Sequence, residues 1–296
     1  MPSAVTRAHA LSGDRLVLSY GGSTVVHGAS LSLEAGRVTA LVGPNGSGKS
    51  TLLRSLARLH RIDEGQVTLG GGDGEPGRPA SLLSARRFAR EVTLFAQARP
   101  TPEGLVVRDV VAFGRHPYRR GLAGLSDQDR RAVEHAMEAT GVRDMADRAA
   151  GQLSGGEMQR VWLATCLAQD TGVVLLDEPT NHLDLRYQVE TLDLIRDLAE
   201  DHGVAVGVVL HDLDHAARVA DTLLLLSAGR VHSAGDPAEV LTSRNLSEVY
   251  GIRVEVAHDP RTGRLRIDPV GRHAARPRSA DADHPNTAEQ NRENHP

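Results

Sequence analysis

The feature that most constrains the fold is an apolar run that leads into a glycine-rich loop and then into a helical repeat. Val38–Val42 has the composition of a buried strand, and residues 43–50 follow it directly with the sequence GPNGSGKS. Leucines then recur within residues 49–59 at the spacing of one helix face. Because a strand, a glycine loop and a helix in this order form a common unit of parallel sheets, we expect an α/β core around this segment.

The later part of the chain fits the same class. Three further apolar runs, at residues 173–176, 204–210 and 222–226, are short and rich in Val and Leu. Helical patterns such as residues 187–201 separate them. Continuous apolar strands that alternate with helices are typical of a parallel sheet covered on both faces. These runs therefore predict strands beside Val38–Val42.

The glycine loop has the pattern of Gly, four residues, Gly, Lys and Ser, which in other proteins binds phosphates. Glycines let successive backbone N–H groups turn toward one anion, and the N-terminus of the next helix adds positive potential. We expect Lys49 to reach the outer phosphates and the Ser50 hydroxyl to coordinate Mg²⁺. The alternative is a glycine turn that only caps a helix. The residues expected at the nucleotide are Gly43, Pro44, Asn45, Gly46, Ser47, Gly48, Lys49, Ser50 and Thr51.

Two carboxylates follow the apolar run at residues 173–176. Asp177 ends that run, and an acidic residue at the end of a strand beside the loop suits the Mg²⁺ shell. Glu178, one residue later, is placed to orient or deprotonate an attacking water. Taken alone, the pair would equally fit two acidic residues that cap the next helix. With Lys49 upstream we assign Asp177 to the metal and Glu178 to catalysis.

The remaining segments suggest how the domain is divided. Residues 15–20 and 30–33 form short β-rich runs near the N-terminus, and helical patterns dominate between residues 98 and 168. Residues 127–140 form an amphipathic stretch after Ser126, a good N-cap residue. We therefore expect a P-loop NTPase core with a mainly parallel sheet, an N-terminal antiparallel β subdomain and an inserted α-helical subdomain. The domain would span residues 12–270, ahead of a disordered tail at 271–296 that is poor in large apolar residues.

A second glycine loop needs a separate explanation. Residues 153–160 read LSGGEMQR and precede the apolar run that ends in Asp-Glu-Pro. This combination resembles the signature of ABC-transporter ATPase subunits, and the resemblance extends over about residues 15–267. It includes Tyr20 as the aromatic that stacks on adenine, Gln97 as the Q-loop residue, residues 181–184 as the D-loop and His211 as the switch histidine. These positions occur in the order that the family shows.

The resemblance implies how the second loop works. A glycine-rich helix N-terminus is an anion site, but one chain offers it no second phosphate. In the family two copies pack head to tail, so that each signature loop closes on the γ-phosphate of the ATP held by the other copy. The residues that would do so are Ser154, Gly155, Gly156 and Glu157. By the same resemblance, Gln97 meets Mg²⁺ and relays to a transmembrane permease.

Three of these positions have a plain alternative when read alone. His211 at the end of an apolar run is often only a polar cap, and Gln97 after the apolar run at 92–96 could be a strand cap. Tyr20 alone would be an ordinary core or surface residue. The order of the motifs favours the catalytic interpretation of His211 and Gln97 and the adenine-stacking interpretation of Tyr20.

Composition limits the partners. The chain of 296 residues has 34 basic and 38 acidic residues and a net charge of −4, which argues against a nucleic-acid surface. The single cysteine, Cys166, lies in an apolar stretch and is expected in the core. No run approaches the roughly 18 apolar residues of a membrane span, so we expect contact with the cytoplasmic face of the membrane only through the permease.

Further segments point to one transporter group. Residues 113–118 (FGRHPY), Trp162 and residues 249–265 (VYGIRVEVAHDPRTGRL) resemble the ATPases of importers for ferric siderophores, haem and cobalamin. Met158 and the glycine-rich residues 70–79, read as a surface loop, depart from that pattern. The resemblance implies uptake of an iron chelate delivered by a periplasmic or lipoprotein binding protein. The alternatives are a transporter for zinc, manganese or an exported substrate, and an ABC ATPase outside transport.

Overall fold

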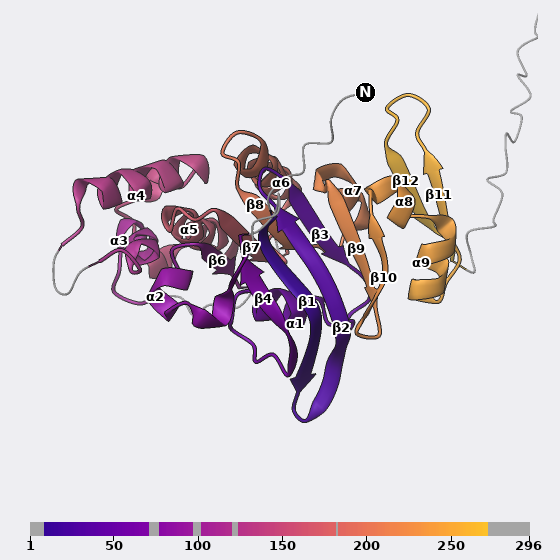
Figure 1. Ribbon diagram of the computed structural model, residues 1–296. Helices are drawn as coiled ribbons and strands as arrows, with labels where there is room; N and C mark the ends of the chain where they lie inside the picture. Colours follow the sequence, from indigo (N-terminus) through magenta and orange to yellow (C-terminus); the bar gives the residue numbers. More distant parts are fainter. Residues whose placement is uncertain (1–8, 71–76, 97–101, 120–123, 182, 272–296) are drawn as a thin grey trace, which may run out of the picture.

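The computed structural model describes residues 9–70, 77–96, 102–119, 124–181 and 183–271 (Figure 1). Gln97, the tail beyond residue 271 and the middle of the glycine-rich segment at 70–79 lie outside the described residues. Among the described helices, none combines the length and the apolar character needed to cross a bilayer.

A six-stranded sheet forms the centre of the molecule, with the strand order β10-β9-β3-β8-β7-β6. All neighbours from β9 to β6 are parallel, and only β10 runs antiparallel to its neighbour. Every residue of β3, β6, β7 and β8 is buried, as expected for strands covered on both faces. The strands are β3 (Val38–Val42), β6 (Val92–Phe95), β7 (Val173–Asp177), β8 (Ala205–Val209), β9 (Thr222–Ser227) and β10 (Arg230–Gly235).

One face of this sheet is covered by α1 (Lys49–Leu56) and by a smaller antiparallel sheet with the order β2-β1-β4-β5. Leu52, Leu53 and Leu56 are fully buried between the two sheets, and burying each contributes about 1.5–3 kcal/mol. Helices α6 (Leu185–Glu200) and α7 (Leu213–Val219) cover the other face. The strands of the smaller sheet are β1 (His9–Tyr20), β2 (Ser23–Glu34), β4 (Glu64–Leu69) and β5 (Arg78–Pro79).

The described chain between β6 and β7 is helical and has its own apolar cluster. Arg115 holds this unit together: it is 1% exposed, pairs with Asp129 at 2.8 Å and donates to the Ala168 carbonyl at 2.9 Å. The motif at residues 113–118 therefore has a structural role at its centre. The elements are α3 (Val107–Ala112), η2 (Phe113–Arg115), α4 (Asp127–Ala139), η3 (Arg143–Met145), η4 (Ala150–Gln152) and α5 (Gly155–Ala168).

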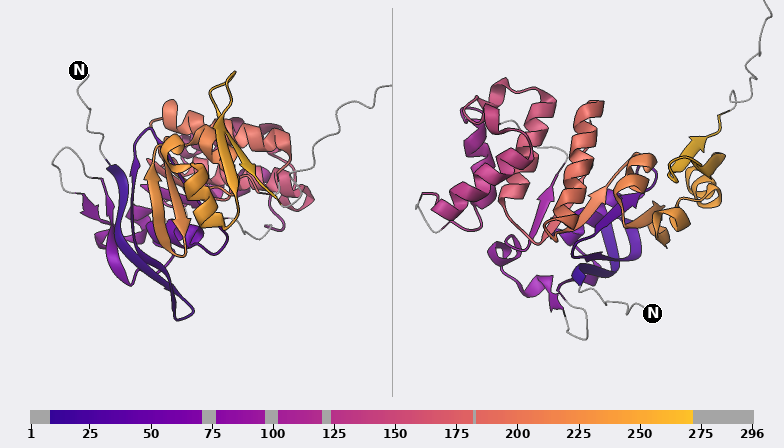
Figure 2. Two further views of the ribbon diagram at one scale, coloured as in Figure 1. Left: turned by 90° about the vertical axis from the view of Figure 1, so that its right-hand side faces the viewer. Right: turned by 90° about the horizontal axis from the view of Figure 1, so that it is seen from above.

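The C-terminal part lies at the opposite end of the central sheet from this helical unit (Figure 2, right). It comprises α8 (Pro237–Val240), α9 (Ser243–Tyr250) and a hairpin of β11 (Val254–His258) and β12 (Leu265–Pro269). The short elements η1 (Ala80–Leu82) and α2 (Ala85–Phe88) precede β6.

The α/β class, the N-terminal antiparallel sheet and the helical insertion are confirmed. So are the Ser126 cap, which forms a capping box with Asp129, and the burial of Cys166. Two details differ. The first helix stops at Leu56 because Arg58 turns to a left-handed φ of 59°. The segment at 70–79, expected to be a surface loop, ends in β5, where Arg78 and Pro79 pair with β4.

Candidate functional site

The glycine loop joins β3 to α1, and two of its glycines are required by space and by backbone conformation. Gly43 has a φ of 143°, and a Cβ there would lie 2.1 Å from the Leu226 carbonyl oxygen. Gly48 has a φ of 96°, and its Cβ would lie 2.9 Å from Val26. Glycine adopts both of these backbone conformations without steric cost, whereas a residue with a side chain would be strained. The loop is thus wedged between the ends of β9 and β2, with α1 pointing its N-terminus into it.

Lys49 is the first residue of α1, and its ammonium group is turned back into the loop. Its Nζ donates to the carbonyl oxygens of Gly43 at 2.8 Å and Pro44 at 2.9 Å, and the residue is 5% exposed. Burial lowers the pKa of Lys49, while the nearby Glu178 and Asp177 carboxylates oppose this shift. Among the described residues, the hydrogen bonds of Lys49 go to neutral carbonyls, which the ammonium group can exchange for phosphate oxygens.

A cavity of about 320 Å³ opens above the loop and collects residues from four separate segments. Tyr20 comes from the end of β1, Glu178 follows β7 and His211 lies two residues after β8. Glu178 and His211 meet the loop because the parallel order β3-β8-β7 brings the carboxyl ends of these strands to one edge, whereas Tyr20 reaches the cavity from the antiparallel sheet. The lining residues are Tyr20, Val25, Asn45, Gly46, Gly48, Lys49, Ser50, Thr51, Glu178 and His211.

Glu178 is held by two side chains. One carboxylate oxygen lies 2.5 Å from His211 Nε2, and the other accepts from Asn181 Nδ2 at 2.5 Å. The backbone of Glu178 has a φ of 57°, a left-handed conformation that non-glycine residues rarely adopt and that clusters at functional sites. Because both oxygens have partners, a water activated by Glu178 must share or replace one of them. The triad of Glu178, His211 and Asn181 can therefore orient a water and accept its proton.

Asp177 is fully buried at the end of β7, and its two oxygens differ. Oδ2 accepts from Arg54 at 3.2 Å and 3.0 Å, whereas Oδ1 is buried with no hydrogen-bond partner among the described residues. An unsatisfied buried oxygen indicates a missing partner. Carboxylate and hydroxyl oxygens are hard donors of the kind that Mg²⁺ prefers, so the free oxygen of Asp177 and the hydroxyl of Ser50, which lines the cavity, suit the ion by their chemistry.

Tyr20 stands at the rim of the cavity and is 71% exposed. Its ring is stacked on the His60 ring, with centroids 6.3 Å apart and planes inclined by 13°. His60 is itself fixed to the Ser19 carbonyl at 2.9 Å. An exposed aromatic ring supported from behind presents a flat surface on which a base can stack.

The second glycine loop lies elsewhere, because none of residues 154–157 lines this cavity. Ser154 caps α5 in a capping box with Glu157, and Arg148 pairs with Glu157 at 2.8 Å. The backbone hydrogen bond from Ser154 and the hydrogen bond from Arg148 lower the pKa of Glu157. Within one chain, therefore, Glu157 is a helix-capping residue whose two carboxylate oxygens both have partners.

Among the described residues, nothing requires glycine at positions 155 and 156. A Cβ at Gly155 would meet no described atom within 4 Å, and one at Gly156 would lie 3.7 Å from Leu183, an ordinary contact. Neither has a positive φ. This contrasts with Gly43 and Gly48, whose conformation and close neighbours require glycine.

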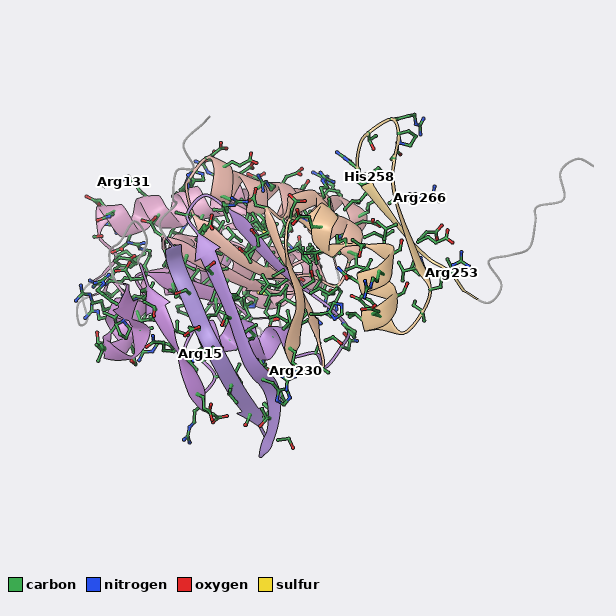
Figure 3. The ribbon with its side chains drawn as sticks, turned by 45° about the vertical axis from the view of Figure 1, so that its right-hand side comes forward. Arg15, Arg131, Arg230, Arg253, His258 and Arg266 are labelled. Atoms are coloured by element: carbon green, nitrogen blue, oxygen red, sulfur yellow. The ribbon has the colours of Figure 1, made fainter. Side chains whose placement is uncertain are left out.

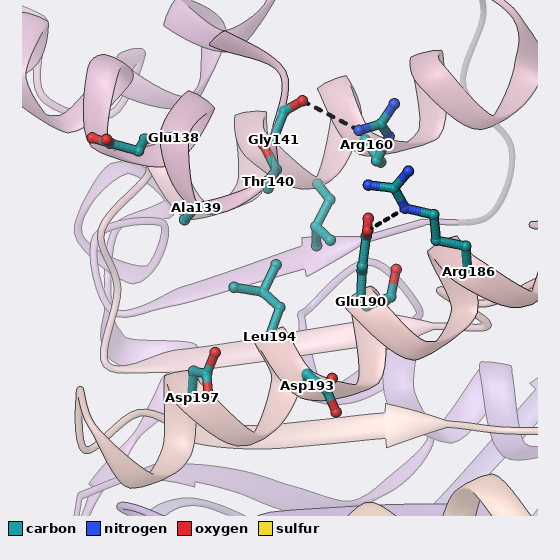
Figure 4. Close-up of a pocket in the computed structure, with 12 residues that line it drawn as sticks. Glu138, Ala139, Thr140, Gly141, Arg160, Arg186, Glu190, Asp193, Leu194 and Asp197 are labelled. Atoms are coloured by element: carbon teal, nitrogen blue, oxygen red, sulfur yellow. Dashed lines mark hydrogen bonds and ion pairs between the residues drawn. The ribbon is translucent and has the colours of Figure 1, made fainter.

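A larger cavity of about 410 Å³ lies between α4, α5 and α6 (Figure 4). Its two arginines already have partners: Arg186 pairs with Glu190 at 2.7 Å, and Arg160 donates to the Gly141 carbonyl at 3.2 Å. Four acidic residues, Glu138, Glu190, Asp193 and Asp197, also line it. The cavity at residues 43–51 is therefore the better candidate for an anionic ligand.

Sequence reasoning missed two supporting residues. Arg54 binds Asp177, which lies 123 residues later in the sequence, and His60 stacks on Tyr20, which lies 40 residues earlier. Neither Arg54 nor His60 belongs to a motif. Their positions follow from α1 passing beneath β7 and from the turn after α1 returning to β1. No local signal in the sequence marks them.

Comparison with known proteins agrees with this geometry. The family model described as "ABC transporter" matches residues 26–181. The chain is 41% identical to the probable siderophore transport system ATP-binding protein YusV of Bacillus subtilis over 89% of this chain and 94% of that protein. It is 39% identical to the ferric enterobactin transport ATP-binding protein FepC of Escherichia coli over 89% of this chain and 95% of that one.

Among solved structures, an inward-facing metal-chelate type ABC transporter matches with a TM-score of 0.76 and 26% identity. The match covers 89% of this chain and 98% of that one. The phosphate loop, the paired carboxylates and the histidine thus lie in a domain of known kind. The chain belongs to the ABC transporter family, as an ATP-binding and ATP-hydrolysing subunit.

Proposed function

We propose that this chain energises an importer for ferric siderophores or related metal chelates, working at the cytoplasmic face of the membrane through a permease. The observation that carries the energising role is the convergence of Lys49, Glu178 and His211 on one cavity. The chelate class is supported by relatives whose names specify siderophore and ferric enterobactin transport. It is also supported by the match to a metal-chelate type transporter.

In this proposal the site residues divide the work. The loop from Gly43 to Thr51 cradles the phosphates, Lys49 neutralises them and Tyr20 stacks on the adenine. Glu178 accepts the proton of the attacking water, with His211 positioning it and the γ-phosphate. Ser50 and Asp177 would hold Mg²⁺, which when bound offsets the negative charge of the phosphates. Gln97 is assigned to the same ion and to the permease by resemblance.

We further propose that two copies pack head to tail, so that Ser154, Gly155 and Gly156 close on the ATP of the other copy. The space at Gly155, where a Cβ would meet no described atom within 4 Å, supports this, because a partner's phosphate can approach the backbone N–H groups of a helix N-terminus closely there. Glu157 would act by fixing that N-terminus. ATP then becomes part of the dimer interface, and ATP hydrolysis opens the dimer.

The organisation of the rest follows the same proposal. Residues 12–270 form the ATPase domain, and about residues 98–168 form the helical subdomain that faces the permease. A periplasmic or lipoprotein binding protein would deliver the chelate to the permease without touching this chain.

Uptake of radiolabelled iron chelate tests the proposal. A strain that lacks the gene should lose uptake, the wild-type gene should restore it, and a Glu178→Gln gene should not. Unchanged iron uptake in the deletion strain, with a loss of zinc or manganese uptake or of export instead, would replace the chelate assignment by one of those functions. Restoration by Glu178→Gln would remove Glu178 from the energising step.

A further inference from the structure

Gln159 is a polar residue inside the fold that the site described above does not use. Arg131, Arg253 and Arg266 are exposed on the outside of the molecule (Figure 3), as is usual for long polar side chains. Gln159 instead is half-buried on α5, three residues after Gly156 of the second glycine loop. It is not one of the residues that line the cavity above the phosphate loop. Its role therefore lies elsewhere than in contact with the nucleotide.

The Gln159 side chain crosses from α5 to the segment that carries Glu178. Its Nε2 donates a hydrogen bond to the carbonyl oxygen of Pro179 at 2.5 Å. Pro179 follows Glu178 directly, and its ring locks φ, so few rotatable bonds separate this carbonyl from the Glu178 backbone. A hydrogen bond at Pro179 therefore restrains the position of Glu178.

Further contacts pack the start of α5 against the chain that follows Glu178. Leu183 lies 3.7 Å from the place that a Cβ on Gly156 would take. The Arg160 guanidinium lies over the ring of Tyr187 in α6, 4.2 Å from its centroid. Val161, in the next turn of α5, is fully buried in the helical unit. Helix α5 therefore gives the turn after Glu178 a fixed support.

Glu178 needs such a support because its backbone is strained. Its left-handed φ of 57° is a conformation that persists only where the surrounding structure holds it. On one side, the Glu178 N–H donates to the Val209 carbonyl at 3.2 Å, and the Asn181 N–H donates to the Glu178 carbonyl at 3.3 Å. On the other side, Gln159 holds the next carbonyl along the chain. Without that bond the turn is freer to relax toward a negative φ, which moves the carboxylate away from His211.

We propose that Gln159 is a positioning residue for ATP hydrolysis: its amide holds the turn after Glu178 against α5 and so keeps the Glu178 carboxylate at the cavity. This inference rests on the proposed role of Glu178 as the base. Gln159 acts only through the backbone of its own chain, and the groups that would bind the phosphates are untouched by its loss. The rate of hydrolysis should therefore depend on Gln159, whereas the affinity for ATP should not.

The test is Gln159→Met, which keeps a side chain of similar length and removes the hydrogen-bond donor. We expect the kcat of the purified full chain at saturating ATP and 20 °C to fall about three- to ten-fold, the effect of one lost hydrogen bond. The Kd for ATP should stay within about two-fold. Gln188→Met is the matched control, because Gln188 of the neighbouring α6 is also half-buried and its side chain makes no hydrogen bond among the described residues. Its kcat should equal that of the wild type.

Mixed dimers separate this role from one in the adjacent glycine loop. Under the proposed head-to-tail packing, Lys49→Ala and Gly156→Asp chains form one intact site together, and its phosphate loop and Glu178 come from the Gly156→Asp chain. Gln159→Met added to that chain should lower the activity of the mixture about three- to ten-fold. Added to the Lys49→Ala chain, which supplies only the glycine loop, it should change the activity less than about two-fold. The reverse pattern, or equal losses in both placements, would overturn the inference.

The single variant is decisive by itself. A kcat for Gln159→Met equal to that of the wild type overturns the inference, even if the melting temperature is lower, because the rate at 20 °C reports on folded molecules. If the mixture without Gln159→Met is inactive, the head-to-tail packing fails and this kcat still decides. Glu178→Gln, measured alongside, separates the two levels of the argument. If Glu178→Gln hydrolyses ATP normally, the proposed base fails; if it is inactive while Gln159→Met is not slowed, only the role of Gln159 fails.

Discussion

Replacing Glu178 by Gln removes the proposed base and almost nothing else. The amide has the shape of the carboxylate and keeps one oxygen as an acceptor, so one of the two bonds from His211 and Asn181 survives. A positioned general base contributes about 10²–10⁴-fold to a rate, so ATP turnover should fall to about 1% or less. ATP affinity should be retained or slightly higher, because a negative charge is removed from a cavity that receives an anion.

The assay is phosphate release at saturating ATP, together with the Kd for ATP and the apparent mass in solution with ATP present. With hydrolysis blocked, Glu178→Gln should accumulate as an ATP-bound dimer. Glu190→Gln is the matched control, since Glu190 pairs with Arg186 on the exposed surface of α6 and should turn over ATP normally. Turnover by Glu178→Gln above about a tenth of the wild-type rate would refute the reasoning, since loss of a general base should lower the rate at least about 100-fold.

Three further outcomes follow from the same structure. Lys49→Ala should weaken ATP binding at least about ten-fold, because hydrogen bonds to charged groups are each worth about 1.5–3 kcal/mol. Equilibrium titration with ATP measures the affinity. An unchanged affinity would contradict the assignment of Lys49 to the phosphates. Arg115→Met should lower the free energy of unfolding by about 3–5 kcal/mol, since the substitution leaves the Asp129 carboxylate buried without its cation. Urea unfolding measures this free energy. A loss below about 1 kcal/mol would show that the ion pair is dispensable. Burial raises the pKa of Asp129, but hydrogen bonds from Ser126 and Arg115 outweigh it and hold the pKa below its ordinary value of 3.8. The stability that Asp129 contributes is therefore fully present above that ordinary value and is lost as the pH falls through the lower pKa of the folded state. In acid unfolding, the stability of Asp129→Asn should fall less steeply with pH than that of the wild type. Identical pH profiles for the two proteins would count against the ion pair.

The sequence alone was sufficient to predict those parts of the molecule in which a functional or structural constraint fixes the residue type at neighbouring positions. The phosphate loop needs glycine where φ is positive, and the strand before Asp177 must be apolar because it is buried on both faces. Both constraints leave a contiguous signature in the chain. This is why the cavity around Lys49 and Glu178 could be predicted.

The supporting contacts left no such signature. Arg54 reaches Asp177, and His60 reaches Tyr20, only because segments distant in sequence are packed together. An arginine in a helix or a histidine after a helix has many possible partners, and the partner is decided by packing rather than by spacing in the sequence. The assignment of Ser154, Gly155 and Gly156 to a second copy drew on resemblance, and the structure adds that no described atom lies within 4 Å of a Cβ at Gly155.

The central claim is that each ATP site is completed by the second glycine loop of another copy. Mixing two inactive variants tests it directly: Lys49→Ala, which disables the phosphate loop, and Gly156→Asp, which fits the space in its own chain but carries a negative charge to the partner's phosphate. A mixed dimer contains one site with both defects and one site with none. An equal mixture should therefore recover roughly a quarter of the wild-type ATPase rate if the two sites act independently. A mixture no more active than either variant alone would contradict the account.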